Sequence, residues 1–133
     1  MYRYACLWVI ALLFISCQES FDERLSKEVS NYTQKHCPKN EDAFSRLDSI
    51  TYQADNRTIH FWYMLHGDGC SLENKLLLKA NYAQIHHELI RRLRGDVQWN
   101  DCKEEGINFR YNYFLEDTQQ AFLTFDIVPN DYR

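Results

Sequence analysis

The start of the chain limits how much of it is available to fold. Residues 1–4 carry one positive charge, at Arg3, and the twelve residues 5–16 carry no charge and are almost wholly apolar. This order is typical of a secretory signal peptide. The apolar run is too short to cross a membrane as a helix, which takes about 20 residues. We therefore expect residues 1–16 to be removed and the folded part of the protein to lie outside the cytoplasm.

The apolar run closes with Phe14, Ile15, Ser16 and Cys17. These residues resemble the lipobox of bacterial lipoproteins. The resemblance implies cleavage before Cys17, attachment of fatty acyl chains such as palmitate, and a lipidated tether over residues 17–20. Phe14 stands where that motif usually has Leu, so cleavage near Ser16 with Cys17 left as an ordinary thiol is the alternative. The lipobox predicts a protein held on a membrane of the bacterial cell envelope, at its periplasmic or outer-membrane face.

Length and charge restrict the remaining chain further. Cleavage at this point leaves 117 of the 133 residues, which is close to the commonest size of one domain and too few for two cores. We therefore predict a single domain over residues 21–133. Loss of Arg3 leaves 14 basic and 19 acidic residues, a net charge of −5. An acidic domain is not a nucleic-acid binder by default, and we expect no nucleic-acid partner.

The spacing of apolar residues predicts two amphipathic helices. The first covers residues 21–37 and is ended by Pro38; the second covers residues 72–94, with Ser71 as its N-cap and Gly95 as its stop. Their apolar positions are Phe21, Leu25, Val29 and Tyr32 in the first helix, and Leu78, Tyr82, Ile85, Leu89 and Leu93 in the second. Each helix therefore has one face that must pack against other parts of the chain.

Alternation of apolar and polar residues predicts two β-hairpins. The first joins residues 47–52 to residues 58–65 through good turn residues, and the second joins residues 107–115 to residues 121–128. The order helix, hairpin, helix, hairpin predicts an α+β fold with a four-stranded, mainly antiparallel sheet and both helices on one face. This reasoning leaves the strand order open.

Three cysteines besides Cys17 remain in a compartment that usually permits disulfides. In the predicted layout Cys37 precedes the first strand and Cys70 follows the second, so both lie at one end of the sheet, whereas Cys102 lies at the other. We therefore predict a Cys37–Cys70 disulfide, which would stabilise the fold by about 3 to 4 kcal/mol through the unfolded state.

A metal site is the alternative at the same end of the sheet. His36, Cys37, His66 and Cys70 would supply the two nitrogen and two sulfur ligands that structural zinc takes, although their spacing matches no established zinc pattern. The corresponding alternative function is a metal-dependent enzyme or metal-binding protein. The chain has no Gly-x-Ser-x-Gly motif and no Gly-x-Gly-x-x-Gly series. The sequence therefore favours a non-catalytic protein without a cofactor over an enzyme.

The sheet face turned away from the helices is the candidate binding surface. By alternation it carries His60, Trp62 and Met64 from the first hairpin, and Arg110, Phe114 and Phe122 from the second. So many large apolar side chains on a solvated face indicate a surface for a partner or ligand. The alternative is that residues 39–44 or 97–99 fold over this face and make it ordinary core.

Several stretches together resemble a group of small, functionally uncharacterised exported proteins of bacteria. They are Cys37-Pro38, Arg46-Leu47-Asp48-Ser49-Ile50, Thr58-Ile59-His60-Phe61-Trp62-Tyr63, and residues 106–113 and 126–132. The resemblance implies no activity. Members tend to end in a cysteine that could pair with one before the third strand, where this chain has Tyr132, so the resemblance implies that Cys102 is a free thiol. We expect a membrane-tethered envelope lipoprotein that acts as a non-catalytic binding or accessory module, with an envelope protein or a small apolar ligand as its partner.

Overall fold

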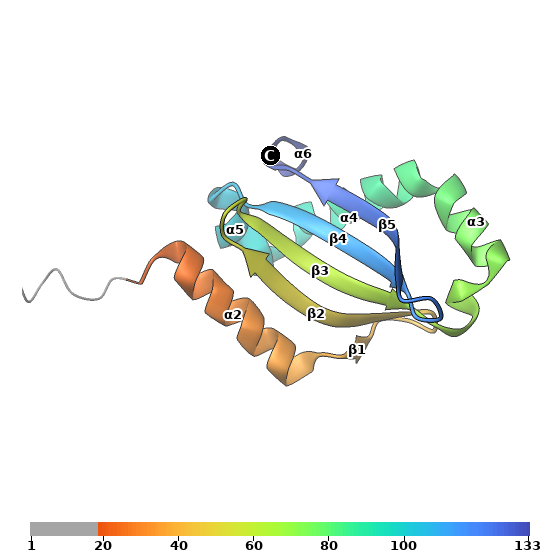
Figure 1. Ribbon diagram of the computed structural model, residues 1–133. Coiled ribbons are helices and arrows are strands. Elements are labelled where there is room, and N and C mark those ends of the chain that lie inside the picture. The colour runs from red at the N-terminus through yellow and green to blue at the C-terminus, as the bar shows by residue number, and fades with distance from the viewer. Residues whose placement is uncertain (1–18) are drawn as a thin grey trace, which may run out of the picture.

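The structure, a computed structural model, describes residues 19–133. The predicted signal peptide of residues 1–16 and the predicted lipidation site at Cys17 lie outside the described residues. Within them a β-sheet carries helices along its length (Figure 1). In chain order the elements are α2 (Phe21–His36), β1 (Lys39–Asn40), β2 (Ser45–Gln53), β3 (Thr58–Leu65), the 3₁₀ turn η1 (Gly67–Cys70), α3 (Leu72–Ala80), α4 (Tyr82–Gly95), the 3₁₀ turn η2 (Val97–Trp99), α5 (Asn100–Glu104), β4 (Asn108–Leu115), β5 (Gln120–Ile127) and α6 (Pro129–Tyr132). No helix in this part of the chain combines the length and apolar character that a membrane span requires.

The sheet has five strands in the order β1-β2-β3-β4-β5, and it is mixed. Neighbouring strands are antiparallel except at the centre, where β3 and β4 run parallel. The predicted four-stranded, mainly antiparallel sheet is therefore wrong, although the fold is α+β. The two hairpins meet in parallel because the chain between them crosses back along the whole sheet through α3, α4 and α5.

The fifth strand, β1, is short and carries no apolar signal. Lys39 and Asn40 are both exposed, and they pair with Leu47 and Arg46 of β2. Alternation cannot be seen in two polar residues, and the sequence accordingly predicted a loop here. A short, polar edge strand of this kind also discourages pairing with other chains.

The predicted second helix is interrupted at Asn81. Its backbone leaves the helical region (φ −102°, ψ 17°), and its side-chain amide donates to the carbonyl of Leu77 at 2.8 Å. Asparagine competes in this way with backbone hydrogen bonds of a helix. α3 buries none of its residues, whereas α4 buries Leu89 and Leu93. The apolar stripe is therefore a core-packing surface in α4, while α3 extends away from the core.

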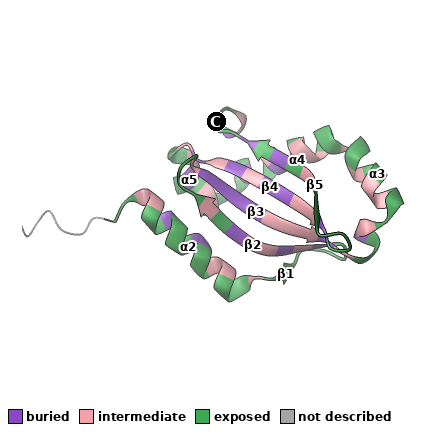
Figure 2. Cartoon of the chain, in the orientation of Figure 1, coloured by how far each residue is buried: buried purple, intermediate pink, exposed green. Residues whose placement is uncertain are grey.

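The core lies between the sheet and the helices. Leu25 and Val29 of α2 and Leu89 and Leu93 of α4 belong to one cluster of buried residues, so both helices cover the same face of the sheet. Figure 2 shows the buried positions along β3 and β4. The largest fully buried side chains are Phe109, Phe125, Ile59, Leu93, Ile107 and Ile127. The inward positions that alternation indicated in both hairpins supply most of this set.

Helix side chains contact the outward backbone of β2, beyond the end of β1, and of β5, the strand at the other edge of the sheet. On β2, the hydroxyl of Thr33 in α2 accepts a hydrogen bond from the Ile50 N–H and donates one to the Ile50 carbonyl, both at 2.9 Å. On β5, the Tyr82 hydroxyl of α4 donates to the Thr124 carbonyl at 2.6 Å, and His86 Nε2 lies 2.7 Å from the Asp126 carbonyl. These contacts occupy backbone groups that would otherwise be free to pair with another strand.

Thr33→Val is expected to destabilise the protein by about 1 to 3 kcal/mol, because the Ile50 N–H and C=O both lose their partner. Thr33→Ser retains the hydroxyl and is expected to recover most of the loss. Urea unfolding of the three proteins measures the difference. Equal stability of the valine and serine variants would show that the hydroxyl does not hold the β2 edge.

Candidate functional site

The structure brings the predicted surface residues together on the sheet face away from the helices. In the parallel register His60 lies beside Arg110, and Met64 beside Phe114. Trp62 lies between these two pairs on β3. Phe122 is at the irregular position of β5 where pairing shifts by one residue, so it lies at the border of this surface. We call the surface formed by these six residues, together with Asn112 and Asp126, the outer face.

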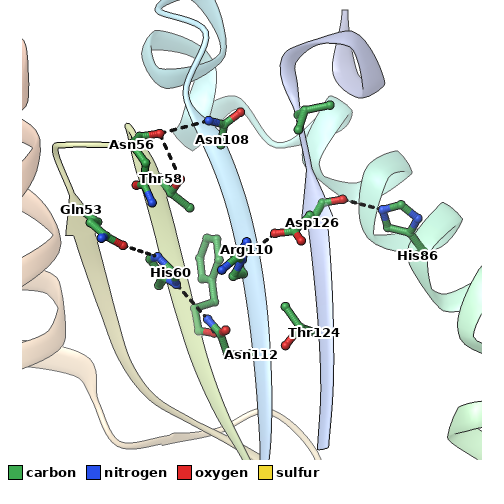
Figure 3. A network of polar contacts seen from close by, with 12 residues as sticks. Gln53, Asn56, Thr58, His60, His86, Asn108, Arg110, Asn112, Thr124 and Asp126 are labelled. Atoms are coloured by element: carbon green, nitrogen blue, oxygen red, sulfur yellow. Dashed lines mark hydrogen bonds and ion pairs between the residues drawn. The ribbon is translucent and has the colours of Figure 1, made fainter. Parts of the chain in front are cut away.

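One half of the outer face is polar and centres on His60. Its Nε2 lies 3.3 Å from Gln53 Oε1, and its Nδ1 accepts a hydrogen bond from the Asn112 amide at 3.1 Å (Figure 3). The Asn112 amide also lies 3.4 Å from the Phe61 carbonyl. His60 is only 7% exposed and Asn112 only 8%. With Nδ1 as acceptor and Nε2–H as donor to Gln53, these contacts fit a neutral imidazole.

An ion pair lies next to this network. Arg110 Nε donates to Asp126 Oδ1 at 2.6 Å across β4 and β5, which are directly paired at these residues. Burial lowers the pKa of His60, and the nearby Arg110 guanidinium lowers it further, while the Asp126 carboxylate acts in the opposite direction. The geometry and the electrostatics therefore both favour neutral His60.

The other half of the outer face is aromatic. The Trp62 ring stacks on His60 at 5.3 Å between centroids and meets Phe114 at 5.8 Å with a tilt of 41°. Its indole N–H donates to Thr51 Oγ1 at 2.8 Å. His60, Phe114 and Thr51, the partners of Trp62, all lie on strands. At the border of the surface, the ammonium group of Lys79 in α3 lies 5.3 Å from the centroid of the Phe122 ring.

The two segments that could have covered this surface pack elsewhere. Trp99 makes edge contacts with Phe61 and Phe109 on the helix side of the sheet. Phe44 lines a cavity together with Leu78 of α3, also on that side. Neither residues 97–99 nor Phe44 therefore turns the outer face into ordinary core.

The predicted Cys37–Cys70 disulfide is not formed in the structure, where Cys37, Cys70 and Cys102 are free thiols. The Cys70 thiol instead donates to the Leu65 carbonyl at 3.0 Å, at the end of β3. Cys102 is buried in the core, and this burial raises its pKa to about 11. Its thiol is therefore protonated at neutral pH and acts as a small core side chain.

The alternative metal site is not assembled by residues 19–133. No three His, Cys, Asp or Glu side chains in this region gather closely enough to hold an ion. The His36 ring instead packs against Tyr32 with 4.7 Å between centroids and a tilt of 43°. His66 has a buried Nε2 without a hydrogen-bond partner in the described structure. His36, His66 and Cys70 therefore do not form a common ligand set.

Sequence reasoning missed the residues of β2 that support the outer face. Thr51 holds Trp62 and Gln53 holds His60 through hydrogen bonds. Both residues belong to β2, which pairs with β3 on the side opposite β4. The signal was present in the alternation of residues 50–53, in which Ile50 faces the core. A pairing irregularity between Leu47 and Ser49 shifts this alternation along the strand.

Comparison with known proteins places this domain in a family. The family model described as a domain of unknown function, DUF8479, matches residues 20–123. This chain belongs to that family. The match runs from the start of α2 into β5, so the DUF8479 domain includes the central strands of the outer face. The expectation of a functionally uncharacterised family is confirmed.

A solved structure shares the fold of this DUF8479 protein. It is the crystal structure of a candidate secreted protein from Pseudomonas aeruginosa, with a TM-score of 0.67 and 12% sequence identity, covering 87% of this chain and 100% of that one. At this identity the likeness concerns the fold. No curated protein matches the sequence.

His60 is expected to make stability depend on pH. Because its pKa is lower in the folded protein than the ordinary value of 6.5, the unfolded chain takes up a proton first as the pH falls. The free energy of unfolding should therefore decrease as the pH falls below about 6.5 and level off below the folded pKa.

Urea unfolding at pH 7.5 and pH 5 (roughly one unit or more on either side of the ordinary histidine pKa) measures this contribution. His60→Gln should show a smaller loss of stability between the two values than the unchanged protein. His87→Gln, at an exposed position of α4, is the matched control and should behave like the unchanged protein. Identical losses in all three proteins would contradict a buried, neutral His60.

Proposed function

We propose that this DUF8479 protein is exported, is tethered to an envelope membrane through a lipidated Cys17, and binds a partner protein through its outer face without catalysing a reaction. The leader and lipobox-like residues support export and tethering. The structural neighbour from Pseudomonas aeruginosa, described as a candidate secreted protein, supports an extracytoplasmic location. The domain would then face the space outside the cytoplasm on a short tether.

The outer face carries this proposal because it combines apolar area with a fixed polar centre. Trp62 and Phe114 form its aromatic half, and His60 with Asn112 forms its polar half. All of these side chains stand on paired strands, so little conformational freedom would be lost on binding. Aromatic residues that are rigidly held beside satisfied polar groups are typical of the centres of protein interfaces.

The shape of the surface favours a protein over a small ligand. Five cavities of the described chain are lined by other residues, and none of these five includes Trp62, Met64 or Phe114. Small ligands usually bind in concave sites that enclose them. A strand surface that lies outside these five cavities is better suited to a partner with a surface of its own.

The same geometry argues for binding rather than catalysis at this surface. Both ring nitrogens of His60 already have partners, and Arg110 is paired with Asp126. A general base needs a ring nitrogen within reach of the proton that it removes. The groups of the outer face thus stabilise one another and fix the surface.

Lipidation is tested with Cys17→Ser in the full chain. The unchanged protein is expected to incorporate labelled palmitate and to fractionate with membranes, whereas the variant should lose the label because it lacks the acylated sulfur. Cys37→Ser is the control and should remain labelled. Absence of label from the unchanged protein would contradict the tether.

Partner binding is tested by placing a charge on the outer face. Trp62→Glu and Phe114→Glu are each expected to weaken capture of a cross-linked envelope partner at least about tenfold, because a carboxylate would be desolvated in the interface. Val97→Glu introduces the same charge at a side chain that is 77% exposed in η2 and should leave capture intact. Circular dichroism checks that all three proteins are folded. Unchanged capture by folded Trp62→Glu and Phe114→Glu would show that the outer face is not the site.

A further inference from the structure

A row of three tyrosines lies on the opposite side of the sheet, beneath the helices. Tyr63 of β3 stacks on Tyr113 at 4.9 Å and on Tyr111 at 6.4 Å, with ring planes within 13° of parallel. α2 packs against β2, and α4 lies along β5 through its contacts with Thr124 and Asp126. The two helices therefore lie over opposite margins of this side of the sheet (Figure 1). We call the three stacked rings, together with the two cavities that Tyr113 lines beside α4, the tyrosine trough.

The hydroxyls of this row have no partner within residues 19–133. Other tyrosine hydroxyls in the same region are used: those of Tyr52 and Tyr132 donate to Asp22 and to the Ile107 carbonyl. None of the three trough hydroxyls is among the fully buried polar atoms without a partner. They are therefore not fully enclosed, and no group of residues 19–133 uses their hydrogen-bonding capacity. Tyr111 is only 8% exposed, and Tyr113 lines both adjoining cavities.

Burial raises the pKa of all three tyrosines, that of Tyr113 to about 12. Their hydroxyls consequently remain protonated at physiological pH and offer O–H donors to whatever enters the trough. The faces of electron-rich rings also attract cations. Polar groups on a surface that serves only for packing usually have hydrogen-bond partners, so three neighbouring tyrosine hydroxyls without one are unusual.

Two cavities adjoin the row and share Ile85 and Tyr113. One, of about 240 Å³, has mainly apolar walls that include Phe44 and Leu78. The other, of about 380 Å³, has polar and apolar walls in about equal parts, with Glu88 and Arg92 among its polar lining. Phe44 is 46% exposed at the apolar end. An occupant with apolar side chains on one side and polar groups on the other would match both cavities.

The charges around the trough are predominantly acidic. Glu41, Asp42 and Asp96 each lie close enough to raise the pKa of at least one trough tyrosine. Arg92 is the opposing charge, and its guanidinium lies 3.5 Å from the Glu88 carboxylate. A cationic occupant is therefore favoured. A second copy of this chain, with a net charge of −5 after cleavage before Cys17, would meet like charge here, and so would an anionic lipid surface.

We propose that the tyrosine trough binds an amphipathic, positively charged peptide segment of another protein. Its apolar side chains would enter the cavity beside Phe44 and Ile85, its Lys or Arg side chains would meet the acidic rim, and the tyrosine hydroxyls would donate to its carbonyl groups. This is a helix-flanked groove for a peptide, a common mode of recognition. It is separate from the outer face, because the two surfaces lie on opposite sides of the sheet.

The test uses the full chain, purified as the cell processes it, and two synthetic peptides. One is an amphipathic peptide of leucine and lysine, and the other has glutamate in place of each lysine. The basic peptide is expected to bind at least about tenfold more tightly, with an affinity that falls as salt rises. It should shift the ring signals of Tyr63 and Tyr113 in NMR spectra. Equal binding of the two peptides, no binding of either, or shifts confined to the outer face would overturn the proposal.

Variants locate the binding. Tyr63→Phe and Tyr113→Phe preserve the rings. Each should lower the affinity for the basic peptide by about three- to tenfold, because one hydrogen-bond donor is lost. Glu41→Lys should weaken it about tenfold, whereas Glu104→Lys, in α5, should not. Trp62→Glu should bind the peptide normally even though it disrupts the outer face, so failure of one proposal is distinguishable from failure of the other. Unchanged binding by Tyr113→Phe and Glu41→Lys would show that the peptide lies elsewhere.

Discussion

The arrangement depends on how the helices attach to the edges of the sheet. Thr33 of α2 satisfies both backbone groups of Ile50, and Tyr82 and His86 of α4 contact consecutive outward carbonyls of β5. Loss of the partner of the part-buried Ile50 groups would cost about as much as a lost hydrogen bond, so Thr33 fixes where α2 lies. The more exposed contacts of Tyr82 and His86 align α4 with β5. The helices are thereby held at opposite margins. Their positions leave Tyr63 and Tyr113 partly exposed on the helix side of the sheet, and they leave the outer face without a helical layer.

The two sides of the sheet consequently differ in chemistry. On the outer face His60, Asn112, Arg110 and Asp126 each have a protein partner, as His60 does with Gln53 and Asn112. In the trough the hydroxyls of Tyr63, Tyr111 and Tyr113 are unpaired in the described structure and the surrounding charge is mainly acidic. The polar residues of the outer face are thus already hydrogen-bonded within the protein, whereas the tyrosine trough has hydrogen-bond donors that no residue of the described structure uses. The two proposed binding modes differ accordingly.

The sequence predicted local structure well and long-range structure poorly. The boundaries of α2 follow from the spacing of Phe21, Leu25 and Val29 and from Pro38, and both hairpins follow from alternation, because these signals lie within a few residues of one another. The members of the outer face could be named for the same reason. β1 could not be found, since two exposed polar residues carry no periodicity. The parallel pairing of β3 with β4 depends on the path of the entire crossover between them. A pattern of a few neighbouring residues carries no information about that path.

That parallel pairing also has a consequence for how the protein reaches this state. Each hairpin can form from neighbouring residues, but the central join between Thr58–Leu65 and Asn108–Leu115 unites strands separated by the whole crossover. Closing a long loop before its contacts form is entropically costly, and sheets built on such distant pairs assemble slowly. Until the join is made, one side of β3 and one side of β4 are unpaired edges with aromatic side chains. A chain that emerges on the far side of a membrane from its N-terminus onward would pass through this stage before its last two strands arrive, which makes the time between emergence and closure the period of greatest exposure to aggregation.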